Sequence, residues 1–526
     1  MKSEDLLDAI GEAKDEYVQD VRNGKGAQKR PWKKWGAAIA ACLVLALGLN
    51  AVLENLGANT GTGGDVDLNY MHYMGPVLPL TVQGDPDGIT AARNVDYNFS
   101  GYYTHQEHYT DETGEPVYYD RYDNTAFVTD SYVLTNHSGE DKTVTLQYPF
   151  AGNLQEWKYY PTVSVNGKTV AVVMHPGPYS GGFEGVWGAD TSELLNLDPL
   201  ENFEGYQTLL SDGAYKESAF DPFPVLDQPV YVYKLHDYIY SKTTEKVNPT
   251  LSFSFYIDYD KTTVFSYGMN GATWDPESGY CARRTGGIEY RPNVDPEFQH
   301  PDAAYVILMG EDLENYTLQG YKNGACNPGE ELNDLGCTVT RYETTLGEIM
   351  AELMADFHGE RFGPSEEALA ENVPGGLSAV KELHYGLSAE LLCTYGVIGN
   401  APVERYELGE LGSIFSAALT NSRVIYLTFD VTVPAGGTVA VEAAQVKDAS
   451  VDFIGNDKDK DGFDMATKLG SNLTFTEQTA SICRFEEIEI VAQNFGFDLE
   501  NGVTKVTLDT TQEHYWIQVR KIHRDG

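Results

Sequence analysis

Residues 35–53 read WGAAIAACLVLALGLNAVL, and this stretch decides how the rest of the chain is organised. It contains one polar side chain, Asn50, and no charged side chain. A helix needs about 20 apolar residues to cross the hydrocarbon core of a bilayer. A helix also satisfies its backbone hydrogen bonds internally, as lipid requires. The stretch therefore predicts a transmembrane helix at 35–53, with a short segment before it and a long one after it.

The charges beside this stretch predict its orientation. Six basic side chains precede it closely, whereas residues 54–74 contain no Lys or Arg. Because basic flanks stay on the cytoplasmic side, we expect residues 1–34 inside the cell and residues 54–526 outside, in a single-pass protein of the cell membrane. The alternative is a leader that is removed, either a secretory signal or a lipoprotein signal ending at Cys42, since such leaders also begin basic and turn apolar.

Residues 1–34 combine a predicted amphipathic helix with the basic flank. Leu6, Leu7, Ile10 and Tyr17 recur at helical spacing and form one apolar stripe. The opposite face is acidic, which is unlike helices that lie on membranes. Because an isolated helix of this length is marginally stable, the stripe predicts a cytosolic protein partner. The alternative is an unfolded tail.

The acidic balance of the chain limits the partners outside the membrane. The chain holds 36 Lys and Arg against 79 Asp and Glu, a net charge of −43. Such a surface repels phosphate backbones, so we expect no nucleic-acid partner. An envelope glycan or an envelope protein remains open as a ligand. The alternative is that the charge only keeps an exported protein soluble.

The long outer segment is predicted to be mainly β. After a Gly-rich linker, residues 54–75, residues 76–340 hold many short alternating runs with turn residues between them, such as 128–136, 142–150 and a hairpin at Asn166-Gly167. This pattern favours β-sandwiches over a parallel α/β sheet, in one or two domains. Residues 341–400 form a helical insertion that a capping box at Thr345 opens, and residues 401–526 form a C-terminal β domain. The predicted fold class is a multidomain β-sandwich ectodomain with a helical insertion and one N-terminal transmembrane helix.

One acidic motif resembles a metal site. Asp457, Asp459 and Asp461, with Gly462 after them, resemble the opening of an EF-hand calcium loop. Met465 and Lys468 stand where that loop has its later ligands, so only half of the ligand pattern for Ca²⁺ is present. The alternative is an exposed acidic turn.

No motif is strong enough to name a reaction, so we predict no catalytic residue and no cofactor. His105, Glu107 and His108 lack the spacing of a zinc protease. Ser378 and Lys381 match S-x-x-K, but the later motifs of penicillin-recognising enzymes are missing. Cys326 and Cys337 flank a short loop and are close enough in sequence for a disulfide. Aromatic clusters that suit sugar stacking or ordinary packing occur at Tyr102-Tyr103, at Tyr118-Tyr119 with Tyr122, and at Trp157 with Tyr159-Tyr160.

The first 55 or so residues carry a family resemblance. LLDAIGEAKDEYVQDV at 6–21, then basic residues, then WKKWGAAIAACLVLAL at 32–47, resembles the membrane anchor of anti-sigma-factor-like proteins of Gram-positive, Clostridia-type bacteria. That resemblance implies a cytoplasmic helix that holds a sigma factor and an outer domain that senses. We therefore expect an extracytoplasmic sensor or binding protein without catalytic activity. The alternatives are a glycan-binding or adhesive surface protein and a surface hydrolase.

Overall fold

The computed structural model describes residues 68, 70–102, 104–110, 116–122, 124–179, 200, 202–243, 247–288, 303–362, 373–452 and 459–522, which all belong to one unit of the chain, Gly63–Gly526. The predicted cytoplasmic helix, the predicted transmembrane helix at 35–53 and most of the predicted linker lie outside these residues. Within the described residues, no helix has the length and apolar character needed to cross a membrane.

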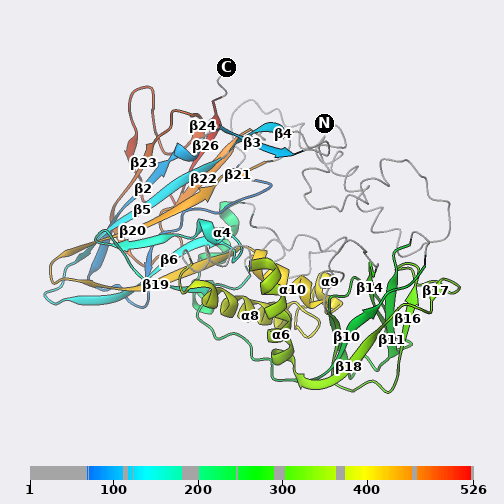
Figure 1. Ribbon diagram of the computed structural model, residues 1–526. Coiled ribbons are helices and arrows are strands. Elements are labelled where there is room, and N and C mark those ends of the chain that lie inside the picture. Colours follow the sequence, from blue (N-terminus) through cyan, green and yellow to red (C-terminus); the bar gives the residue numbers. More distant parts are fainter. Residues whose placement is uncertain are drawn as a thin grey trace. The chain divides into compact units, whose positions relative to one another are not determined.

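The described part of the chain is mainly β, with several antiparallel sheets and a few helices (Figure 1). The largest sheet has seven strands in the order β25-β23-β2-β5-β20-β7-β8. All its pairings are antiparallel except β2 with β23, which is parallel. Side chains of β2 alternate strictly between buried and half-buried, as expected for a strand with one face on a core. The strands are β2 (Ile89–Asn98), β5 (Thr125–Asn136), β7 (Thr162–Val165), β8 (Lys168–Thr169), β20 (Thr438–Asp448), β23 (Thr474–Cys483) and β25 (Lys505–Thr507).

A four-stranded sheet shares a hydrophobic core with the largest sheet. Its order is β1-β6-β19-β9, with β1 (Thr81–Val82), β6 (Lys142–Gly152), β9 (Val173–Pro176) and β19 (Arg423–Val433). Leu134 of β5 and Val441 of β20 belong to the same buried cluster as Leu146 of β6 and Leu427 of β19. The predicted strands at 128–136 and 142–150 are confirmed, but each belongs to a different one of these two sheets.

Two connections between these sheets are bound to each other. The chain passes from β5 to β6 through residues 137–141 and from β19 to β20 through residues 434–437. The Asn136 side-chain amide donates to the Val433 carbonyl at 3.0 Å, and the Gly436 amide donates to the Ser138 carbonyl at 3.0 Å. Hydrogen bonds therefore hold the two connections against each other.

Both sheets combine strands from the regions predicted as separate domains, 76–340 and 401–526. Ile425 of β19 lies opposite Phe150 of β6, and Val441 of β20 lies opposite Tyr132 of β5. The hydrogen-bonded sheets thus cross the predicted domain boundaries. The periodicity of a strand indicates which face is buried but not which distant strand lies beside it, so the sequence pattern did not reveal this interleaving.

Two further sheets pack around a second core. One has the order β12-β15-β10-β18 and the other β13-β14-β11-β16-β17, and Tyr233, Phe253 and Val306 lie in the core that they share. The first contains β10 (Pro229–Ile239), β12 (Thr263–Tyr267), β15 (Ala303–Met309) and β18 (Gly336–Thr345). The second contains β11 (Thr250–Tyr256), β13 (Gly271–Asp275), β14 (Tyr280–Gly286), β16 (Tyr316–Tyr321) and β17 (Glu331–Leu332).

The remaining described strands form a small sheet and a hairpin. The sheet has the order β21-β22-β26-β24, with β21 (Ser450–Val451), β22 (Asp461–Ala466), β24 (Ile488–Gln493) and β26 (His514–Lys521). The hairpin joins β3 (Thr104–Thr110) to β4 (Pro116–Tyr122). The turn predicted at Asn166-Gly167 is confirmed: it joins β7 to β8, and its residues have φ angles of 50° and 73°, as a two-residue hairpin turn requires.

Three of the described helices, α6 (Leu346–Phe362), α8 (Gly376–Thr394) and α10 (Leu411–Thr420), lie beside one another (Figure 1). The predicted capping box is confirmed, because the Glu348 amide donates to Thr345 Oγ1 at 3.3 Å and the Thr345 amide donates to Glu348 Oε2 at 3.2 Å. The prediction that β structure returns at about 402 is wrong for α9 (Glu404–Glu407) and α10. Leu411, Ile414, Phe415 and Ala418 have helical spacing, and that signal was missed.

Two short helices were also not expected from the β pattern of 76–340. They are α4 (Phe203–Leu210) and α5 (Ala214–Ser218). Asn202 caps α4, since its side-chain oxygen accepts a hydrogen bond from the Gly205 amide at 3.1 Å. Phe203 and Tyr206 are buried on one side of α4 and reach the site described next.

Candidate functional site

Residues 70–75, called the strap from here on, bind along the edge of the small sheet. The strap is the last part of the predicted linker. His72 exchanges two backbone hydrogen bonds with Val451 of β21, of 3.1 and 3.0 Å. The Met71 amide donates to Asp452 Oδ1 at 2.9 Å, and the Met74 amide donates to Ser450 Oγ at 3.0 Å. The strap thus pairs like a short additional strand, with Tyr70 buried and Tyr73 half-buried, so these residues do not behave as a flexible linker.

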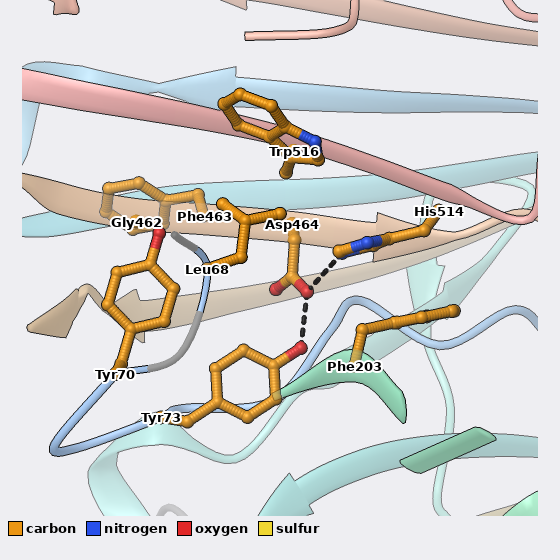
Figure 2. Close-up of a pocket in the computed structure, with 9 residues that line it drawn as sticks. All are labelled: Leu68, Tyr70, Tyr73, Phe203, Gly462, Phe463, Asp464, His514 and Trp516. Carbon is orange, nitrogen blue, oxygen red and sulfur yellow. Dashed lines mark hydrogen bonds and ion pairs between the residues drawn. The ribbon is translucent and has the colours of Figure 1, made fainter. Parts of the chain in front are cut away.

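A buried carboxylate lies beneath the strap. Asp464 of β22 is 4% exposed, and its Oδ2 accepts hydrogen bonds from the Tyr73 hydroxyl and from His514 Nε2, the latter at 2.8 Å. Figure 2 shows Tyr73 and His514 pointing at this one carboxylate from two different segments. Oδ1 of Asp464 has no hydrogen-bond partner among the described residues. Asp464 lines a niche of about 10 Å³, close to the space that one water molecule needs.

Aromatic rings hold both donors in place. The Phe203 ring of α4 stacks on the His514 ring with centroids 3.9 Å apart. The Tyr70 ring stacks on the Tyr73 ring at 6.1 Å. Burial, reinforced by the nearby Asp464 charge, raises the pKa of Tyr73 well above its ordinary value. Tyr73 therefore stays protonated and keeps donating to Asp464.

A lysine also reaches the strap from below. Lys447 of β20 is 8% exposed and donates from Nζ to the Met74 carbonyl at 3.0 Å. Burial lowers the pKa of Lys447 to about 8, although the Asp464 and Asp448 charges oppose that shift. The strap is thus bound partly through an ammonium group that burial penalises.

Two hollows border the strap, and both include Met74 and Glu156 in their walls. The larger hollow has a volume of about 190 Å³ and combines two tyrosine rings with polar groups. The smaller, of about 20 Å³, adds Tyr159, Lys447 and Asp448. A few polar groups beside aromatic rings are typical of sites for small polar ligands. The larger hollow is lined by His72, Tyr73, Met74, Ala151, Gly152, Asn153, Gln155, Glu156, Tyr206, Thr420 and Ser422.

Asn153 orients the carboxylate in this wall. Its side-chain oxygen accepts hydrogen bonds from the amides of Gln155 and Glu156, both at 3.0 Å. Its side-chain nitrogen donates to Glu156 Oε2 at 3.1 Å. The loop after β6 is therefore folded around one side chain, and Glu156 is presented to the hollows as a positioned hydrogen-bond acceptor.

A larger hollow on the outer face of the seven-stranded sheet is a weaker candidate. It measures about 480 Å³ and is shallow, with Asn94, Ser131 and Thr479 on its floor. Two of these side chains are already hydrogen-bonded, since Thr479 Oγ1 donates to Asn94 Oδ1 at 2.7 Å and Asn94 donates to Ser481 Oγ at 3.3 Å. The hollows beside the strap are therefore the better candidate site.

The calcium motif is only partly described. Asp457 lies outside the described residues, Asp459 is exposed, and Asp461 begins β22. Asn124 donates to Asp461 Oδ1 at 3.4 Å, and burial raises the pKa of Asp461. Across the described residues, no three His, Cys, Asp or Glu side chains are grouped so as to hold a metal ion. Calcium binding stays a prediction, as does partner binding by Leu6, Leu7, Ile10 and Tyr17, which lie outside the described residues.

The other sequence candidates lie apart from the strap. His105, Glu107 and His108 belong to β3, and Ser378 is exposed in the first turn of α8. Cys326 and Cys337 are free thiols. The aromatic cluster at 157–160 borders the candidate site, through Tyr159 and Tyr160.

The residues that define the site carry no short motif. His72, Asn153, Lys447 and Asp464 come from four distant segments, which is why sequence reasoning missed them. Asp464, which lies between the apolar residues Phe463 and Met465 in β22, was an available signal. No family model matches the chain, and a search of curated proteins finds no significant match.

Proposed function

We propose that the protein is a membrane-anchored sensor or binding protein without catalytic activity, with its N-terminus in the cytosol and an extracytoplasmic β-sandwich body. The uncharged run at 35–53 and its basic flank support the anchor and its orientation. The anti-sigma-like N-terminal segment supports a cytosolic protein partner.

The strap is the observation that carries this proposal. In sequence it is the first described segment after the proposed anchor, and it forms part of the wall of both hollows. A ligand in the larger hollow would contact His72 and Tyr73, which belong to the same segment that leads to the membrane. Binding outside and the state of the membrane-proximal chain would then be physically linked.

The experiment uses the full-length chain in intact cells and in solubilised membranes. Externally added protease should cleave after residue 60, and alkaline carbonate should leave the chain in the membrane. Affinity capture of the full-length chain should recover a cytosolic partner that Leu7→Asp with Ile10→Asp abolishes. Asp8→Asn, on the opposite face of the predicted helix, is the matched control and should retain the partner. Capture that does not differ between these variants removes the cytosolic half of the proposal, and protection from protease removes the orientation.

Glycan binding is the second candidate, and the larger hollow favours it. Tyr73 and Tyr206 line this hollow, and Glu156 offers a positioned acceptor for a hydroxyl group. A glycan array probed with the solubilised full-length chain should give hits that Glu156→Gln weakens. Glu500→Gln, an exposed acid of the same charge, should leave those hits unchanged. An array without hits above background counts against this candidate.

A further inference from the structure

Hydrogen bonds and two tyrosine rings hold the strap. Its backbone pairing is confined to residues beside β21, a strand of two residues. Met71 at the start of the strap is 49% exposed. The buried contacts are those of Tyr73 with Asp464, of Met74 with Lys447 and of Tyr70, whose hydroxyl accepts from Gln518 at 3.3 Å. Apart from the Tyr70 and Tyr73 rings, the strap is therefore held by a few hydrogen bonds and not by a continuous apolar face.

Two of these contacts carry an electrostatic cost in the bound state. Asp464 is buried with one oxygen unpartnered among the described residues, and burying a carboxylate without full hydrogen bonding is unfavourable. Lys447 is buried with no carboxylate of the described residues within ion-pair distance. Water would reach both groups if the strap left. Release of the strap would therefore let water hydrate Asp464 and Lys447, which partly offsets the hydrogen bonds that are lost.

We propose that the strap is a releasable element that regulates the larger hollow. When bound, it supplies His72, Tyr73 and Met74 to the wall of that hollow; when released, it removes this wall and uncovers Asp464 and Lys447. This inference rests on the proposed function, because it describes how binding there is coupled to the membrane-proximal chain. A ligand that fits the hollow stabilises the bound strap, and by linkage a pull that releases the strap weakens ligand binding by the same factor.

Hydrogen exchange of the full-length chain in lipid nanodiscs tests the proposal. The amides of His72 and Met74 should exchange through local opening, at least 10-fold faster than the amide of Tyr132 in the centre of β5. Tyr73→Phe keeps the ring but removes the donor to Asp464, and should accelerate strap exchange about 10-fold or more, since hydrogen bonds to charged groups are among the stronger ones. The exchange of Tyr132 should not change.

Tyr233→Phe is the matched control. Tyr233 also donates its hydroxyl to an aspartate, Asp312, at 2.6 Å, but in β10. The Tyr233→Phe variant should leave the exchange of the strap amides unchanged. If strap amides exchange as slowly as Tyr132 in the unmodified chain, or if Tyr73→Phe accelerates both equally, the strap opens only with the whole unit and the proposal is overturned.

A second variant changes Gly462 of β22, which lies against the Tyr70 side chain of the strap. A Cβ at Gly462 would lie 2.2 Å from the Tyr70 hydroxyl oxygen and 2.4 Å from the adjoining ring carbon, so Gly462→Ala should displace Tyr70 and accelerate strap exchange. Gly139→Ala, where a Cβ meets nothing within 4 Å, is its control. Unchanged strap exchange in Gly462→Ala overturns the proposal. If affinity capture recovers no cytosolic partner while strap exchange changes as expected, only the proposed function is refuted.

Discussion

At the scale of single residues, the largest sheet contains a fully buried ion pair between Arg93 and Asp130. Arg93 of β2 donates from Nε and Nη2 to the two carboxylate oxygens of Asp130, each at 2.8 Å, and neither side chain is exposed. Arg93 also donates to the Ala466 carbonyl at 2.6 Å, and Tyr132 donates to Asp130 at 2.6 Å. This network ties β2 and β5 to β22, which belongs to another sheet.

Removing the charge of Asp130 should be costly. Asp130→Asn leaves the Arg93 guanidinium buried without its counter-charge, and breaking a buried pair in this way costs about 3–5 kcal/mol. Glu489→Gln, which breaks the exposed pair of Arg520 and Glu489, is the control and should cost less than about 1 kcal/mol. Urea unfolding of both variants measures the difference. Equal, small losses would show that water reaches the Arg93 site.

At the scale of elements, two histidines connect three helices. His358 of α6 and His384 of α8 lie 2.7 Å apart between Nε2 and Nδ1, and His384 Nε2 lies 2.8 Å from the Phe415 carbonyl of α10. His384 must donate from Nε2 to that carbonyl, so its neutral ring accepts at Nδ1 from His358. Burial lowers the pKa of His358 to about 4, with a contribution from Lys381, and lowers the pKa of His384 to about 3.

This pair predicts that acid destabilises the helices. Both folded-state pKa values lie below the ordinary value of 6.5, so the unfolded chain binds more protons between about pH 6.5 and pH 4. Stability is therefore fully present above pH 6.5 and falls as the pH decreases, by up to about 1.4 kcal/mol per pH unit for each proton. Urea midpoints measured between pH 7 and pH 4.5 should show this slope.

His384→Gln provides the test of the cause. A glutamine amide can still donate to Phe415 and accept from His358, but it cannot take up a proton. In His384→Gln the loss of stability per pH unit should fall by the contribution of one proton, up to about 1.4 kcal/mol. His137→Gln, at an exposed histidine, should leave the slope unchanged. Parallel curves for the unmodified chain and His384→Gln would contradict the assignment.

At the scale of the whole molecule, local sequence patterns predicted individual strands, turns and helices but not which distant strands pair with one another. The Asn166-Gly167 turn and the Thr345 capping box depend on neighbouring residues, and both were foreseen. The pairing of Phe150 with Ile425 joins segments far apart in sequence, so no local pattern could indicate it. The candidate site was missed for the same reason, whereas the proposed anchor and its sidedness stay predictions.

The interleaved sheets lead to a prediction about truncation. A chain that ends at residue 400 lacks β19 and β20, so β6 loses its long partner and β5 keeps only β2. We expect this chain to show no cooperative unfolding by far-ultraviolet circular dichroism and rapid proteolysis, whereas the full-length chain unfolds cooperatively. Cooperative unfolding of the truncated chain would instead support the predicted domain at 76–340.

The parallel pairing of β2 with β23 has a mechanical consequence. β2 follows the strap in the chain, and β23 leads toward the C-terminal strands. Opposed pulls on the start of β2 and on the end of β23 would draw the two strands past each other along their common axis. The ladder between them is then loaded in shear, so its hydrogen bonds share the force instead of opening one after another. This pair of strands should therefore resist stretching more strongly than the strap that precedes it.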